Sequence, residues 1–118
     1  MKHHILFSII MVITFYSCGS TNAQKDTTNC IQQKIEEFKK QPVTNPPMSV
    51  YQYTYNDALV YYIPGPCCDR YATLYDKNCN IICRPSGGIT GKGDGKCTDF
   101  FEKSTDKKII WQDDRKYK

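Results

Sequence analysis

Cysteine is the residue type whose number and spacing give this chain its clearest chemistry. The chain has 118 residues and seven cysteines, and six of these fall between residues 30 and 97. Thiols at this density in a small exported chain usually pair as disulfides. We therefore predict a framework of three disulfides that uses Cys30, Cys67, Cys68, Cys79, Cys83 and Cys97.

The pairing of these thiols stays open, because six cysteines permit many connectivities. We expect only that Cys67 and Cys68 bond to different parts of the fold, since a disulfide between adjacent residues is strained. A four-cysteine zinc site is an alternative use of the thiols, but an oxidising compartment disfavours it. Thiol redox catalysis is disfavoured as well, because the chain lacks a Cys-x-x-Cys motif.

A glycine-rich loop over residues 84–96 is the possible contact surface. It lacks the residue order of a phosphate-binding loop or a dinucleotide-binding turn. Asp94 and Asp99 are weak candidate calcium ligands, but the twelve-residue calcium-loop pattern is missing, so we predict no metal site. Glycine at positive φ beside a disulfide explains the composition more simply. The residues expected to form the contact are Gly87, Gly88, Thr90, Gly91, Gly93, Asp94 and Gly95.

Histidine gives the strongest exclusion of enzyme classes. The two histidines, His3 and His4, lie in the leader, so the mature chain cannot build a Ser/His/Asp or Cys/His catalytic set or a zinc-protease helix. Carboxylate pairs such as Asp69 and Asp76 could in principle cleave glycosides, but twelve acidic residues make such pairs inevitable by chance. We predict that the protein is not an enzyme and uses no cofactor.

The leader predicts export. A basic start is followed by the apolar run 5–16, which is too short to remain as a membrane span, so residues 1–18 are predicted to be a signal peptide. Its end, Phe15-Tyr16-Ser17-Cys18-Gly19, resembles a lipobox, in which the cysteine is lipidated and becomes the new N-terminus. Removing Cys18 from the count leaves an even six for disulfides. Cleavage after Ala23 is the alternative.

The remaining chain must position these groups. Residues 19–28 are predicted to be a flexible tether, residues 29–113 one disulfide-rich domain, and residues 114–118 a charged tail. A helix should start with Asn29 as its N-cap and stop before Pro42. Its apolar stripe consists of Ile31, Ile35 and Phe38.

Strand signals follow the helix. Segments 49–55 and 59–63 should form a hairpin around Asn56-Asp57, with Tyr51 facing Tyr62, Tyr53 facing Val60 and Tyr55 facing Ala58. Further strands are expected at 71–75, 79–83 and 108–112, with one helical turn within 98–103. The predicted fold is α+β, with one N-terminal helix packed on a small antiparallel sheet of about four or five strands and stapled by disulfides. The tyrosines are expected to pack across strands.

Charge argues against nucleic acid as a partner. The formal net charge is +4, and the lysines are interspersed with acidic residues along the chain. Nucleic-acid binding requires basic residues that cluster on one face.

Several blocks of the sequence form a recognisable set: Cys67-Cys68-Asp69, Leu74-Tyr75-Asp76, Cys79-Asn80, Gly87-Gly88-Ile89-Thr90-Gly91, Gly93-Asp94-Gly95 and Ile110-Trp111. Together they resemble a known family. It is a family of small cysteine-rich exported proteins and lipoproteins, mostly from Bacteroidota, defined only as a domain of unknown function, and the resemblance covers about residues 30–113. It implies an envelope lipoprotein or secreted protein and supplies no catalytic residues. Asp57, where glycine is expected, and Ser86, where an acid is usual, depart from the pattern. Of these blocks, Cys67-Cys68-Asp69 and the glycine-rich block are the most specific.

We therefore expect an exported, lipid-anchored protein of the outer membrane, cell surface or periplasm, or else a secreted one. It would act as a non-enzymatic binding or structural module, held at the membrane through the lipid, with a protein or envelope partner that the sequence does not identify. Two alternatives remain open: a secreted inhibitor of proteases or other enzymes, and a calcium-dependent adhesion module.

Overall fold

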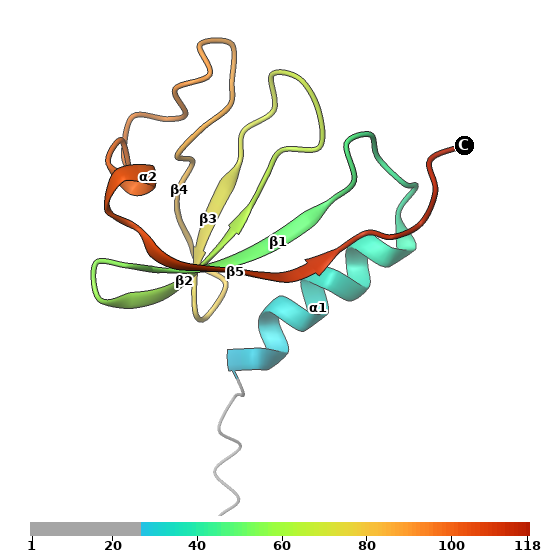
Figure 1. Ribbon diagram of the computed structural model, residues 1–118, viewed down its shortest axis with the longest axis horizontal. Coiled ribbons are helices and arrows are strands. Elements are labelled where there is room, and N and C mark those ends of the chain that lie inside the picture. Colours follow the sequence, from blue (N-terminus) through green and yellow to red (C-terminus); the bar gives the residue numbers. More distant parts are fainter. Residues whose placement is uncertain (1–26) are drawn as a thin grey trace, which may run out of the picture.

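The computed structural model describes residues 27–118, and it has one long helix beside one five-stranded sheet (Figure 1). The strands run antiparallel in the order β4-β3-β2-β1-β5. The predicted α+β fold is confirmed. The predicted signal peptide, Cys18 and most of the tether lie outside the described residues. The elements are α1 (Thr27–Lys40), β1 (Ser49–Tyr55), β2 (Ala58–Ile63), β3 (Thr73–Asp76), β4 (Ile81–Cys83), α2 (Phe100–Lys103) and β5 (Thr105–Gln112).

The β1–β2 hairpin matches the sequence prediction residue by residue. Tyr51 pairs with Tyr62, Tyr53 with Val60, and Tyr55 with Ala58. The turn residues Asn56 and Asp57 have φ values of 49° and 59°. Two consecutive positive φ values are what a tight two-residue hairpin turn requires, and Asn and Asp tolerate them better than most residues.

Other boundaries differ from the prediction. Helix α1 begins at Thr27, so Asn29 lies inside the helix and the N-cap prediction was wrong. The apolar stripe starts only at Ile31 and therefore does not fix where the first turn begins. β3 starts at Thr73, because the amide of Ala72 donates to the carbonyl of Ser86 in a loop. β5 starts at Thr105, since backbone pairing with Thr54 of β1 extends it beyond its apolar part.

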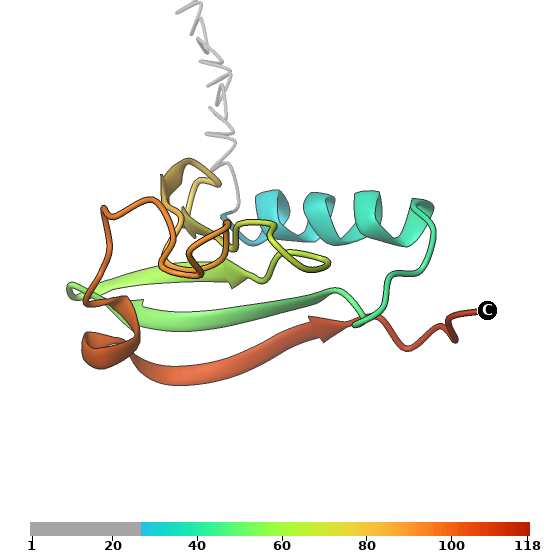
Figure 2. The same cartoon turned by 90° about the horizontal axis from the view of Figure 1, so that it is seen from above.

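The sheet buries a separate cluster of side chains on each side. One cluster packs α1 against the sheet through Ile31, Ile35, Val50, Tyr61 and Ile63. The other contains Tyr53, Tyr55, Val60, Leu74, Cys83, Cys97 and Phe100. Phe100 of α2 is fully buried and packs edge to face against Tyr53 and Tyr55, which anchors the chain just before it enters β5. Seen from above, β5 forms one edge of the sheet (Figure 2).

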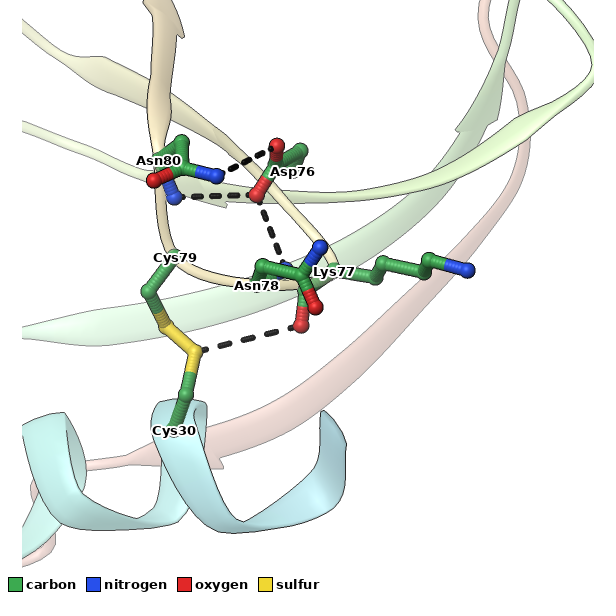
Figure 3. Close-up of a disulfide and its surroundings, with 6 residues drawn as sticks. All are labelled: Cys30, Asp76, Lys77, Asn78, Cys79 and Asn80. Atoms are coloured by element: carbon green, nitrogen blue, oxygen red, sulfur yellow. Dashed lines mark hydrogen bonds between the residues drawn. A yellow bond between two sulfur atoms is a disulfide. The ribbon is translucent and has the colours of Figure 1, made fainter. Parts of the chain in front are cut away.

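All six predicted cysteines form disulfides. Cys30–Cys79 ties the first half of α1 to the turn between β3 and β4 (Figure 3), and Cys83–Cys97 joins the end of β4 to the segment before α2. The third bridge is Cys67–Cys68, so the expectation that these neighbours bond elsewhere was wrong. The backbone turns at this point, since Cys68 has a φ of 60° and the amide of Arg70 donates to the carbonyl of Cys67. The four other cysteines of the described chain pair with one another, which leaves Cys67 and Cys68 to bond to each other.

The end of the chain is part of the fold and not only a charged tail. Arg115 donates to the carboxylate of the buried Asp113, to the carbonyls of Phe38 and Lys39 at the end of α1, and to the carbonyl of Gln41 just after it. The carbonyls at the end of a helix have no partner inside it, and a guanidinium can satisfy several of them at once. Arg115 therefore clamps the C-terminal end of α1 to the segment that follows β5.

None of the helices within residues 27–118 is long and apolar enough to cross a membrane.

Candidate functional site

The glycine-rich loop 84–96 is held in one shape by its own backbone. The amide of Gly93 donates to the carbonyl of Gly87, and the amide of Gly91 donates to the carbonyl of Gly88. Gly93 has a φ of 73°, and a Cβ there would collide with the carbonyl of Arg84. Glycine at this position is therefore required by space as well as by conformation.

Asp94 closes the base of this loop. Its carboxylate accepts hydrogen bonds from the amides of Arg84 (3.0 Å) and Lys96 (3.1 Å), while its own amide donates to the carbonyl of Arg84 (2.8 Å). Desolvation would raise the pKa of Asp94, but the two backbone donors and the nearby Lys96 and Arg84 charges outweigh it and lower the pKa. The ionised carboxylate thus stabilises the loop by accepting hydrogen bonds from both of its ends.

Asp99 belongs to a different group of contacts. It accepts a hydrogen bond from the Tyr55 hydroxyl (2.6 Å) and forms an ion pair with Lys103 (3.1 Å), and these two contacts lower its pKa. The weak calcium candidates, Asp94 and Asp99, are therefore each engaged with protein donors. In the described part of the chain, no three or more His, Cys, Asp or Glu side chains gather where they could hold a metal ion.

A second loop, residues 64–72, packs directly against the first. The amide of Ala72 donates to the carbonyl of Ser86 at 3.0 Å, and the Ser86 and Tyr62 hydroxyls share a hydrogen bond of 3.1 Å. Gly87 approaches so closely that a Cβ there would collide with the carbonyl of Arg70. We call segments 64–72 and 84–96 together the loop pair. Both lie above the sheet in Figure 1, on the side away from α1.

The positions of the two loops along the sequence could have indicated this pairing. Segment 64–72 precedes β3 and segment 84–96 follows β4. Because β3 and β4 pair antiparallel, the start of one and the end of the other must meet at the same end of the sheet.

The exposed side chains of the loop pair are apolar at its tip and basic around it. Ile89 is 93 % exposed, more than any other large apolar residue described, and Tyr71 is 46 % exposed. The Arg84 guanidinium lies over the Tyr71 ring, 5.9 Å from its centroid. Arg70, Lys92 and Lys96 are also exposed.

The structure thus changes which residues make the candidate contact surface. Of the predicted contact residues, Gly88 is buried, and Gly87, Gly93 and Asp94 are only partly exposed and hold the loop together. Thr90, Gly91 and Gly95 are exposed. Ile89 and Tyr71 were not named as contact residues, because the exposure of an apolar side chain depends on how the two loops pack and cannot be read from the sequence.

A shallow pocket of about 490 Å³ lies elsewhere, beside the turn of the β1–β2 hairpin. Its apolar lining includes Leu59 and Ile82. Asp76 also lines it, but its carboxylate accepts hydrogen bonds from the amides of Asn78 and Asn80 and from the Asn80 side chain (Figure 3). Asp76 therefore serves to hold the β3–β4 turn.

Comparison with known proteins assigns the chain to a family. The family described as "Domain of unknown function (DUF6970)" matches residues 36–113, which is more than half of the chain, so the chain belongs to this family. No curated protein and no solved structure matches it significantly.

Proposed function

We propose that this member of the DUF6970 family is an exported, lipid-anchored protein of the cell envelope that binds a partner through the loop pair and catalyses no reaction. The observation that carries the proposal is Ile89, which is 93 % exposed on a backbone that internal hydrogen bonds hold in one shape. Binding residues concentrate on loops that a scaffold holds in position, and Tyr71, whose ring lies beside Gly88, adds a second exposed apolar side chain to this surface.

Export and lipidation are supported by the leader and by the cysteines. All six cysteines from Cys30 onward are in disulfides, which are compatible with an oxidising compartment. Cys18 is the remaining cysteine, and it stands at the end of the apolar leader in a lipobox-like sequence. Acyl chains on this residue would hold the protein at a membrane.

The arrangement of the fold suits an anchored binding module. Helix α1, which follows the proposed tether, lies on one side of the sheet, and the loop pair lies on the other (Figure 1). A chain anchored through its N-terminus would therefore present the loop pair away from the anchor.

The chemistry of the surface favours a protein partner with an apolar pocket and an acidic rim. Burial of an isoleucine side chain is worth roughly 1.5–3 kcal/mol, and little of this would be lost to ordering, because the loop is already rigid. Arg70, Arg84, Lys92 and Lys96 are the exposed basic residues of the loop pair. The loop pair has two acidic residues: Asp69 is exposed, and the carboxylate of Asp94 accepts hydrogen bonds from the loop's own backbone.

Photo-crosslinking in the native organism tests this proposal. A benzoylphenylalanine at position 89 of the full chain should yield a protein adduct of one defined mass. The same probe at Ile109, which is 50 % exposed on β5, is the matched control and should not. Absence of a protein adduct at position 89, or identical adducts at both positions, would contradict the proposed contact.

One observation favours enzyme inhibition as a second candidate function. The Cys83–Cys97 disulfide brackets the loop that displays Ile89, and inhibitors also present a fixed loop between cysteines to their target. The pure domain would be screened against a panel of proteases. Inhibition at micromolar concentration that is lost in Ile89→Asp would support this candidate, and an inactive panel would remove it.

A further inference from the structure

The three disulfides of this protein differ sharply in exposure. Cys83 is 1 % exposed and Cys97 is 6 % exposed, and the residues of the Cys30–Cys79 bridge are half-buried. Cys67 and Cys68 are both exposed, on the outer loop that follows β2. A thiolate from solution or from another protein can therefore reach this bridge first, since exchange requires access to a sulfur atom.

The bridges also differ in what they connect. Cys30–Cys79 and Cys83–Cys97 join residues that are 49 and 14 positions apart, whereas Cys67–Cys68 joins neighbours. A disulfide stabilises a fold mainly by closing a loop of the unfolded chain. A bridge between neighbours closes no such loop, so Cys67–Cys68 has no cross-linking role to explain it.

Opening this bridge would leave its surroundings in place. The turn is closed separately by the hydrogen bond from the amide of Arg70 to the carbonyl of Cys67, at 3.2 Å. Arg70 is in turn packed against Gly65 and Gly87. The two thiols would therefore remain side by side after reduction, ready to close again.

We infer that Cys67–Cys68 is a thiol–disulfide exchange site that oxidises a dithiol, either a small molecule or a protein, stoichiometrically and without catalytic turnover. One thiolate of the dithiol attacks the Sγ of either cysteine, the Cys67–Cys68 bond breaks, and the other cysteine leaves as a thiolate that takes up a proton. The second thiol of the dithiol then displaces the first cysteine. The dithiol becomes a disulfide, and two electrons and two protons pass to Cys67 and Cys68.

Stepwise reduction of the oxidised mature chain tests this inference. The protein is equilibrated with mixtures of reduced and oxidised dithiothreitol, quenched with N-ethylmaleimide, and mapped by peptide mass. The first two alkylated residues should be Cys67 and Cys68, at a ratio of reduced to oxidised dithiothreitol at least tenfold lower than the other four require. Excess oxidised dithiothreitol should restore the bridge.

A Cys67→Ser, Cys68→Ser double variant is the control. It should lose the early step that releases two thiols and keep the later release of four unchanged. First opening of Cys30–Cys79 or Cys83–Cys97, simultaneous release of all six thiols, or an early step that persists in the double variant would overturn the inference. Binding through Ile89 does not depend on this outcome.

Discussion

Loss of the Cys30–Cys79 disulfide should destabilise the domain far more than loss of Cys67–Cys68. The bridge in Figure 3 joins the first half of α1 to the β3–β4 turn across 49 positions of sequence. Closing a loop of that length in the unfolded chain corresponds to about 4 kcal/mol of stability. Ile31 and Ile35 would still hold α1 on the sheet, because they are 4 % and 2 % exposed. We therefore expect Cys30→Ser, Cys79→Ser to fold with its free energy of unfolding reduced by about 4 kcal/mol.

Urea unfolding of the wild type and two double variants measures this difference. Cys67→Ser, Cys68→Ser is the matched control, since it also removes two sulfurs but opens no loop, and it should lose less than about 1 kcal/mol. Linear extrapolation gives each free energy, and the slope with denaturant shows whether the unfolded state has changed as well. Equal losses in the two variants, or a loss below about 1 kcal/mol for Cys30→Ser, Cys79→Ser, would refute the loop-closure reasoning.

Further variants and conditions test other contacts of the fold. Arg115→Ala should lower the Tm by roughly 5–10 °C, because the carbonyls of Phe38, Lys39 and Gln41 lose the guanidinium donor and buried Asp113 keeps only the backbone amide of residue 115. The Arg115 guanidinium lowers the pKa of Asp113 in the folded state. This stabilisation is therefore present above the ordinary carboxyl pKa and is lost as the pH falls through the lowered pKa. The difference in Tm between pH 7 and pH 3 should accordingly be smaller in the variant than in the wild type. Gly93→Ala should destabilise the domain more than Gly91→Ala in urea melts, because both have positive φ but only the first Cβ meets backbone. Millimolar calcium should leave the Tm unchanged in thermal scans, because the carboxylates of Asp94 and Asp99 already interact with donors of the protein. Intact mass of the protein from native membranes should show acyl chains, and Cys18→Ser should release it from the membrane.

Local patterns predicted the parts of the fold that are built locally. The stripe of Ile31, Ile35 and Phe38 gave the helix and the face that packs on the sheet. Asn56-Asp57 gave the hairpin and its register, because a two-residue turn fixes which residues oppose one another. In both cases the determining residues lie within a few positions of each other.

Features that depend on distant partners were missed. Arg115 looked like part of a charged tail, and its role depends on the end of α1 more than 70 positions earlier. Ile89 was not among the residues named for the predicted contact loop, yet it is the most exposed large apolar residue described. The Cys67–Cys68 bridge was rejected on general geometry, but the pairing of the other four cysteines left these two with each other.

The two sides of the sheet would serve different functions in a tethered binding protein: attachment on one side and binding on the other. On the side of α1, the Cys30–Cys79 bridge and the Arg115 clamp secure both ends of the helix that follows the proposed tether. A force on the tether would therefore act on a helix that a disulfide joins to the β3–β4 turn. On the other side, Cys83–Cys97 and the buried Phe100 fix the base of the loop that displays Ile89. Because the clusters on the two sides share no residue, substitutions at the tip of the loop pair should alter binding and leave the attachment of α1 intact.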